Sequence, residues 1–445
     1  MTTFSDLLFL FRFLPVFLLV YYLVPTRFRN LLLFLGSLGF YASFDLLYAG
    51  GFLILIILNY LLSVPVKSKG KKAFFIFAVL LDCSVLVLVK SLEIFSAGFL
   101  LPLGVSFFIF KMISFQAELY LGRIPEKPGF WDTCAYFSLF FQIPEGPIMR
   151  YSEGGFDRER RVSLSEVDRA LCIFAAGLGM KVLLADRFAL LWNELYRTGY
   201  ESISTPLAWI GVIICSFRLY FDFWGYSLMA SSLGMMLGFP FIRNFEHPYA
   251  AASVSEYYRR WHMTLGFFLR DFVYIPLGGS REGRGKTVRN LFLVWLITAV
   301  WHGTSPNFLI WGGVLFLLII WEKFVLSRNK TVLGIFGRFH VIILIPLTWL
   351  VFSITNTTDL QSFLCRLFPF FGIGKTLDPF DWKLVLSAGW YLFPIAFCLC
   401  IPKLADFFAR RLSSIFVRLI LLAVFWVSIY FVVISGSNPF LYYSF

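Results

Sequence analysis

Apolar runs long enough to cross a membrane recur along most of this chain. Three clear examples cover residues 8–24, 51–66 and 415–435. A bilayer core requires about 20 apolar residues per helix, whereas strands of a membrane barrel alternate apolar and polar side chains. These runs are continuous rather than alternating. We therefore predict an all-α polytopic membrane protein of about ten to twelve transmembrane helices, with re-entrant and interfacial helices.

The composition agrees with a membrane protein. The chain is 59% hydrophobic and only 15% charged, whereas soluble domains carry about 25% charged residues. Its net charge of +13 is best explained by basic loops that stay on the cytoplasmic side. The sequence thus predicts membrane lipid as a partner and no nucleic acid. The first apolar run has no preceding basic region and no cleavage site, so we expect it to be retained as a span.

Loops and breaks divide the chain without separating domains. Basic loops at 26–29, 67–72 and 281–289 flank apolar runs, which places them in the cytoplasm. The short runs at 98–110 and 135–147 contain Pro and Gly, and such segments can be re-entrant when protein buries their backbone. No internal repeat or low-complexity linker is evident. We predict a single polytopic membrane domain over residues 1–445.

Polar residues concentrate between 218 and 312, and three of the four histidines fall between 247 and 302. The pattern of 253–272 predicts one amphipathic helix that lies at the membrane interface and is capped by Ser253 or Ser255. Such a helix either anchors the chain to lipid headgroups or uses Arg259 and Arg270 to hold an anionic donor such as a phosphate. Its apolar stripe is Tyr257, Trp261, Leu265, Phe268 and Phe272, and its basic face is Arg259, His262, Gly266 and Arg270.

His302 lies at the end of an apolar run, thirteen residues after Arg289. In a helix this spacing places it roughly 20 Å from the cytoplasmic end. An ionisable group at such depth usually faces a cavity, although a hydrogen-bonded core histidine is the alternative. Gly303 and Pro306 should break the helix just after it. Histidine is a suitable general base near neutral pH, and a second histidine or an arginine can stabilise an oxyanion.

Other chemistries have weaker support in the sequence. The stretches "GTSPN" and "LGGSR" do not form a GxSxG nucleophile elbow, so direct transfer to an acceptor fits better than a covalent acyl-enzyme. His262 and His302 are not spaced as a pair of metal ligands on one helix, and we predict no metal site. We expect structural roles for His247 and His340.

Four blocks of this sequence resemble the membrane-bound O-acyltransferases, most closely the bacterial branch that O-acetylates alginate and other polysaccharides. The resemblance implies that His302 is the catalytic histidine and His262 the second motif histidine. It also implies a core over 101–325, a bacterial cytoplasmic (inner) membrane location and no bound cofactor. The implied co-substrate is a cytoplasmic acyl thioester, acetyl-CoA or an acyl carrier protein, and the outward partner is an SGNH-type acetyltransferase. The blocks are "YFDFWGYSLMA" (220–230), "RNFEHPY" (243–249), "YRRWHMTLGFFLRDFVYIPLGGSR" (258–281) and "VWHGTSPNFLIWGG" (300–313).

Departures from the pattern keep other functions open. "DFWGYSL" and "RRWHMTL" lean toward the branch that transfers D-alanine to teichoic acids, which is the alternative acyl group. A transporter or flippase without chemistry, and a scaffold for polysaccharide synthesis, are the alternatives of other classes. The stretch "FFQIPEGPI" places Glu145 in an apolar setting. Together with Asp222 and Asn307 from the blocks, Glu145 is a further candidate for substrate binding.

Overall fold

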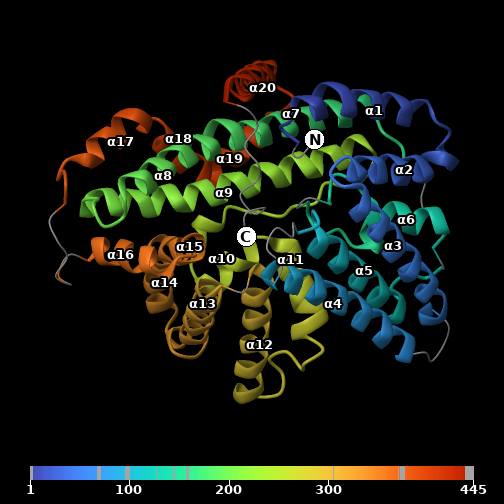
Figure 1. Cartoon of the computed structure of the whole chain (residues 1–445), viewed down its shortest axis with the longest axis horizontal. Coiled ribbons are helices and arrows are strands. Elements are labelled where there is room, and N and C mark those ends of the chain that lie inside the picture. Colours follow the sequence, from blue (N-terminus) through green and yellow to red (C-terminus); the bar gives the residue numbers. More distant parts are fainter. Residues whose placement is uncertain are drawn as a thin grey trace. The chain divides into compact units, whose positions relative to one another are not determined.

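The structure is a computed structural model that describes residues 4–67, 72–95, 101–126, 128–143, 146–156, 160–303, 305–368, 370 and 376–435. Every regular element of these residues is a helix, which confirms the predicted all-α fold (Figure 1). The chain forms two compact units. Unit 1 comprises Met1–Gly177, Tyr226–Arg243 and Ile429–Pro439, and unit 2 comprises Leu178–Gly225, Asn244–Ser428 and Phe440–Phe445.

Several helices of the described residues are long and apolar enough to cross a membrane, so the chain is a multi-pass membrane protein. There are six, or seven if the pair Asp381–Gly389 and Leu392–Cys400, bent by 69°, is one span. The sequence predicts about ten to twelve spans because each apolar run is taken as one span. In the structure some runs fold as helices too short to be candidate spans, such as Phe9–Leu23. The six are Leu46–Lys67, Lys72–Leu92, Thr205–Met236, Pro306–Arg328, Thr331–Ser353 and Ile415–Ser435.

Unit 1 holds the N-terminal helices, drawn in blue to teal in Figure 1. Its helices α3, α4 and α5 pack against one another, and α2 packs against α6. The apolar run at 135–147 is broken as expected, because α6 ends at Ser138 and the described residues after it form no helix until Tyr151. The elements are η1 (Phe9–Phe13), α1 (Leu14–Leu23), η2 (Thr26–Phe28), α2 (Arg29–Ala42), α3 (Leu46–Lys67), α4 (Lys72–Phe95), α5 (Val105–Tyr120), α6 (Phe130–Ser138), η3 (Tyr151–Glu153) and α7 (Leu164–Gly179).

Polar side chains tie the helices of unit 1 together where water is excluded. Asn59 on α3 donates from Nδ2 to Asp82 Oδ1 on α4 over 2.8 Å, and Gln116 on α5 donates from Nε2 to the Asn59 carbonyl over 2.8 Å. All three side chains are buried. Interhelical hydrogen bonds of this kind help membrane helices to associate. We read this cluster as structural.

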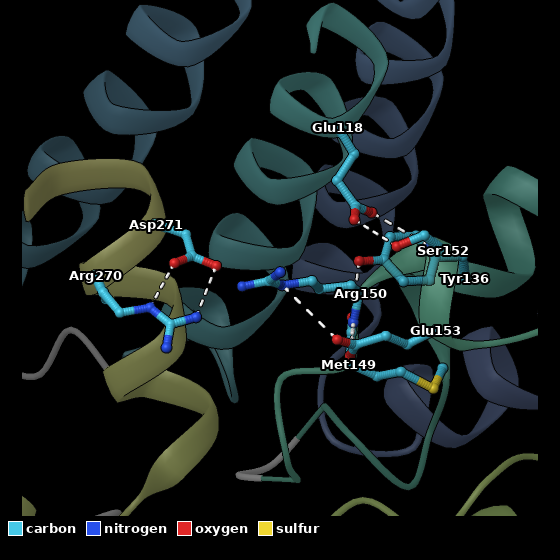
Figure 2. A network of polar contacts seen from close by, with 8 residues as sticks. All are labelled: Glu118, Tyr136, Met149, Arg150, Ser152, Glu153, Arg270 and Asp271. Atoms are coloured by element: carbon cyan, nitrogen blue, oxygen red, sulfur yellow. Dashed lines mark hydrogen bonds and ion pairs between the residues drawn. The ribbon is translucent and has the colours of Figure 1, made fainter. Parts of the chain in front are cut away.

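A second polar group of unit 1 fixes the segment after α6. Glu118 on α5 accepts hydrogen bonds from the Ser152 hydroxyl at 2.5 Å and the Ser152 backbone N–H at 3.3 Å (Figure 2). The Tyr136 hydroxyl donates to the Met149 carbonyl over 2.9 Å. These bonds hold the segment that contains Met149 and Ser152 against α5 and α6.

Unit 2 contains most of the remaining helices, and its core is the packing of α12, α13 and α15. A Cβ on Gly312 of α13 would lie 2.8 Å from the Ala299 Cβ of α12, so glycine allows this close approach. Its elements are η4 (Met180–Ala185), α8 (Asp186–Thr198), the first part of α9 (Thr205–Met236), η5 (Pro248–Ala250), α10 (Val254–Arg260), α11 (Met263–Leu269), η6 (Arg270–Tyr274), α12 (Arg284–His302), α13 (Pro306–Phe324), η7 (Leu326–Arg328), α14 (Lys330–Phe339), η8 (His340–Leu344), α15 (Ile345–Ser353), α16 (Thr357–Leu367), α17 (Asp381–Gly389), α18 (Leu392–Cys400), α19 (Pro402–Ala409) and most of α20 (Ile415–Ser435).

The single amphipathic helix predicted over 253–272 is wrong. The chain forms α10, breaks at His262, and resumes as α11 and η6. The break occurs because His262 adopts a left-handed conformation with φ of 44°, which a continuous right-handed helix excludes. The Ser253 cap is confirmed, since its hydroxyl accepts the Glu256 backbone N–H at 3.1 Å.

Candidate active site

One cavity of about 700 Å³ lies wholly within unit 2. It brings together four residues that the sequence singled out, His262, His302, Arg259 and Arg270. Helices α10, α11, α12 and α13 all contribute to its lining. Tryptophans form much of the apolar wall, namely Trp261, Trp295, Trp311 and Trp349. A pocket with aromatic walls and a few convergent polar groups has the make-up of a ligand site.

His302 is the last residue of α12 and lines the cavity. The helix is continuous from Arg284, and the predicted break follows at once, because α13 begins only at Pro306. The imidazole is 8% exposed and packs edge-to-face on Trp311 and Phe352, with ring centroids 5.2 and 4.9 Å away. These rings fix the orientation of the imidazole and shield it from water.

His262 reaches the cavity from the joint between α10 and α11. Its Nδ1 lies 3.1 Å from Asn244 Oδ1, and the same oxygen accepts the Thr264 backbone N–H at 3.2 Å and the Thr264 hydroxyl at 2.9 Å. The Asn244 carbonyl accepts the Met263 backbone N–H at 2.9 Å. One residue therefore holds both the left-handed joint and the imidazole that it carries.

Burial controls the charge of His262, which lies outside the candidate spans. The side chain is 5% exposed, and desolvation lowers the pKa of His262 to about 3. Burial disfavours the charged form of histidine. His262 is therefore neutral at physiological pH. A charged imidazolium does not fit this environment.

Exposed cations also line the cavity. Those among the described lining residues are Arg259 on α10, Arg270 on η6 and Lys323 on α13. Arg270 donates from Nε and Nη2 to the two oxygens of Asp271 over 2.6 and 3.2 Å (Figure 2). This carboxylate raises the pKa of Arg270 and holds its guanidinium in place. These cations are exposed and also line the cavity, so positive charge lies where its wall reaches the surface.

Glu322 joins the cavity wall to the start of α10. Its carboxylate is 2% exposed and accepts the backbone N–H groups of Val254 and Ser255 at 2.9 and 3.3 Å. The same carboxylate lies 3.0 Å from His340 Nδ1. Carboxylates at helix N-termini satisfy backbone N–H groups that have no partner within the helix. His340 thus supports Glu322, in keeping with the structural role expected for it.

Substitution of Glu322 by Ala should destabilise unit 2 by about 3 kcal/mol. The change leaves the buried backbone N–H of Val254, the partly buried N–H of Ser255 and His340 without their acceptor. We expect a clear drop in the melting temperature of the detergent-solubilised protein. Glu322→Gln keeps an acceptor and is the matched control, which should lose less. Equal melting temperatures for wild type and Glu322→Ala contradict this role.

Asp222 and Asn307, two further predicted residues that the structure describes, do not line this cavity. Asp222 on α9 is 1% exposed and forms an ion pair with Lys181 Nζ at 2.8 Å. Asn307 on α13 is buried and donates from Nδ2 to the carbonyls of Val351 and Phe352 over 3.2 and 3.0 Å. It thereby positions a ring that packs on His302. Glu145 lies outside the described residues.

Two residues of the site were missed from the sequence. Glu322 had a usable signal, because a carboxylate within the apolar stretch "LLIIWEKF" is costly unless it has a partner. Asn244 had only a weak one, since it lies in a motif block but is eighteen residues from His262. Among the described residues, no group of three or more His, Cys, Asp or Glu side chains could hold a metal ion.

Comparisons with known proteins match this chain to one family. The family model for MBOAT, the membrane-bound O-acyltransferase family, matches residues 52–364. The chain is 35% identical to a "probable alginate O-acetylase AlgI" of Pseudomonas fluorescens, over 79% of this chain and 73% of that protein. It is 30% identical to a peptidoglycan O-acetyltransferase of Helicobacter pylori, over 78% and 74% of the two chains. A teichoic acid D-alanyltransferase of Bacillus subtilis is 26% identical over 54% and 66%.

The matched region includes all of α10 to α13 and therefore both cavity histidines. The match covers most of the chain, and the alginate O-acetylase shares more than a third of the aligned residues. The chain thus belongs to the membrane-bound O-acyltransferase family and is a multi-pass membrane O-acyltransferase.

Proposed function

We propose that this protein moves an acetyl group from a cytoplasmic thioester through a membrane tunnel for O-acetylation of an exported polysaccharide, with His302 as general base. The observation that carries the proposal is that His262, His302 and exposed cations line the same cavity. In this proposal residues 1–445 form one polytopic domain of a bacterial inner membrane, and 101–325 are its catalytic core.

Direct transfer needs one base beside the acyl carbonyl. His302 takes the proton of the acceptor hydroxyl while the oxygen attacks the thioester carbonyl. The tetrahedral intermediate then collapses, the C–S bond breaks, and the leaving thiolate takes the proton from His302. Aromatic rings around His302 exclude water from this step, so that hydrolysis does not compete with transfer.

The exposed cations at the cavity support a thioester donor that carries anionic groups. Acetyl-CoA and the phosphopantetheine arm of an acyl carrier protein both present phosphates. Arginine binds phosphate through paired N–H donors, and lysine binds it as a point charge. Arg259, Arg270 and Lys323 all line the cavity, which supports a ligand of this kind.

The acceptor is proposed from the relatives. The alginate O-acetylase at 35% identity and the peptidoglycan O-acetyltransferase at 30% identity are both named for O-acetylation of a glycan. A glycan hydroxyl, reached outside the membrane through an SGNH-type acetyltransferase, is therefore the proposed final acceptor. The D-alanyltransferase is less similar and covers less of the chain, so D-alanine is the second choice of acyl group.

Inside-out membrane vesicles that contain the protein and its cellular partners test this proposal. Vesicles supplied with acetyl-labelled acetyl-CoA should accumulate base-labile label in polysaccharide or in a partner protein. If label appears only when a labelled D-alanyl carrier protein is supplied, the transferred group is D-alanine rather than acetyl, and the reaction class is unchanged. No label from either donor, with the protein inserted at normal abundance, contradicts the enzyme reaction and favours a transporter.

Removal of the two arginines should weaken donor binding rather than chemistry. Hydrogen bonds to charged groups contribute about 1.5 kcal/mol or more, so Arg259→Ala and Arg270→Ala should each raise the KM for acetyl-CoA about tenfold with little change in kcat. Steady-state rates over a range of donor concentrations measure this split. Added salt should reproduce part of the effect in the wild type. A fall in kcat at unchanged KM contradicts a donor-binding role, and unchanged KM and kcat for both variants favour lipid anchoring instead.

A further inference from the structure

The Asn244 side chain determines which nitrogen of His262 carries the proton. The Asn244 Oδ1 atom accepts the backbone N–H of Thr264, and a backbone N–H can only donate. The atom that faces this segment is therefore the amide oxygen and not the amide nitrogen. An amide oxygen can only accept, so His262 Nδ1, at 3.1 Å from it, must be the donor.

A neutral imidazole with its proton on Nδ1 has a lone pair on Nε2. His262 is buried, and burial keeps it neutral at physiological pH. In this state Nε2 accepts hydrogen bonds and cannot donate them. This excludes His262 as a donor to an oxyanion, and it suits a ligand group with an O–H or N–H.

We propose that Asn244 is a positioning residue that holds His262 in the Nδ1-protonated tautomer, so that Nε2 accepts a hydrogen bond from a hydroxyl or amide N–H of a bound substrate. This inference rests on the proposed function. It assigns different duties to the two histidines, since His302 removes a proton and His262 orients the substrate without changing charge. Both the acceptor hydroxyl and the amide groups of a pantetheine arm offer suitable donors.

The surroundings of His262 support this assignment. Charged side chains that line the same cavity come from α10, η6 and α13, namely Arg259, Arg270, Glu322 and Lys323, and His302 on α12 is the other titratable imidazole. Burial is the only cause behind the lowered pKa of His262. Phe223 packs edge-to-face on the ring with a centroid distance of 4.7 Å. The hydrogen bond to Asn244 Oδ1 favours the Nδ1-protonated tautomer.

The decisive variant is Asn244→Asp, which keeps an acceptor for Nδ1 and adds a negative charge. The carboxylate favours the imidazolium and so raises the pKa of His262. Below the new pKa, Nε2 carries a proton and no longer accepts. We expect the rate of acetyl transfer from acetyl-CoA, relative to wild type, to fall at least tenfold at mildly acidic pH and to return to within about twofold at alkaline pH. Asn244→Ala should lose at least tenfold at every pH, because the tautomer and the joint are both released.

The matched control is Asn356→Asp. Asn356 caps α16 and also accepts two backbone N–H groups through Oδ1, at 2.8 and 3.3 Å, but it does not line the cavity. Its pH profile should match that of the wild type. A rate for Asn244→Asp that is unchanged, or lowered by one factor at every pH, overturns the proposal in favour of a purely structural asparagine. A rate that rises at acidic pH overturns it in favour of a cationic His262. If the wild type transfers no acyl group at all, the proposed function fails and not this inference alone.

Discussion

Replacement of His302 by Ala should remove ester-linked acyl groups from the cell's surface polymers. A positioned general base contributes about 10²- to 10⁴-fold to a rate, so transfer should fall to background while the protein inserts at normal abundance. Acyl groups released by mild base and identified by mass spectrometry measure the loss. The identity of the missing group, acetyl or D-alanyl, also decides between the two donors.

A second variant separates chemistry from packing at the same position. His302→Gln keeps polar atoms against Trp311 and Phe352 but cannot take up a proton at neutral pH. It should be as inactive as His302→Ala if the imidazole is the base. Normal acylation in His302→Gln indicates instead a packed histidine, and another residue must then act as the base.

Substitution of Lys181 by Met should cost about 3–5 kcal/mol of stability, the largest structural effect that we expect. Lys181 Nζ lies 2.7 Å from Asp186 and 2.8 Å from Asp222, and all three side chains are buried. Burial lowers the pKa of Lys181, but the charges of Asp222 and Asp186 raise it more, so the ammonium stays protonated. Its removal leaves two buried carboxylates without a counter-charge. Thermal unfolding in detergent measures the change.

The neutral triple variant Lys181→Met, Asp186→Asn and Asp222→Asn tests what Asp222 does. It removes all three charges together, so much of the lost stability should return. Recovery of both stability and transfer assigns Asp222 to the buried ion pair alone. Recovery of stability without transfer supports the substrate-binding role predicted for Asp222. A melting temperature for Lys181→Met equal to the wild type contradicts the ion-pair account.

The membrane class and the helical fold follow from the hydrophobic pattern, because unbroken apolar runs of this length are compatible with few structures other than membrane-spanning helices. The end of α12 at His302 was also predictable, since Gly303 and Pro306 stop a helix. The joint at His262 was not. Its left-handed conformation depends on Asn244, and the contact between these residues is set by tertiary packing rather than by local sequence.

The same limit explains why side chains from separate segments were not linked to one another in advance. The pairs Glu322–His340 and Lys181–Asp222 join residues on different helices, and periodicity carries no information about such partners. A buried carboxylate in an apolar run indicates that a partner exists but does not identify that partner. The roles of Asp222 and Asn307 in substrate binding remain predictions.

The left-handed backbone at His262 also has a consequence for engineering. A residue other than glycine held in this conformation costs about 1–3 kcal/mol, so the protein is less stable with histidine at this joint than it would be with glycine. Screens that reward thermostability should therefore favour glycine or asparagine at position 262. Such clones will survive heating and lose the imidazole. Libraries designed to increase the thermostability of this acyltransferase should keep residue 262 fixed and introduce stabilising substitutions at positions remote from the joint.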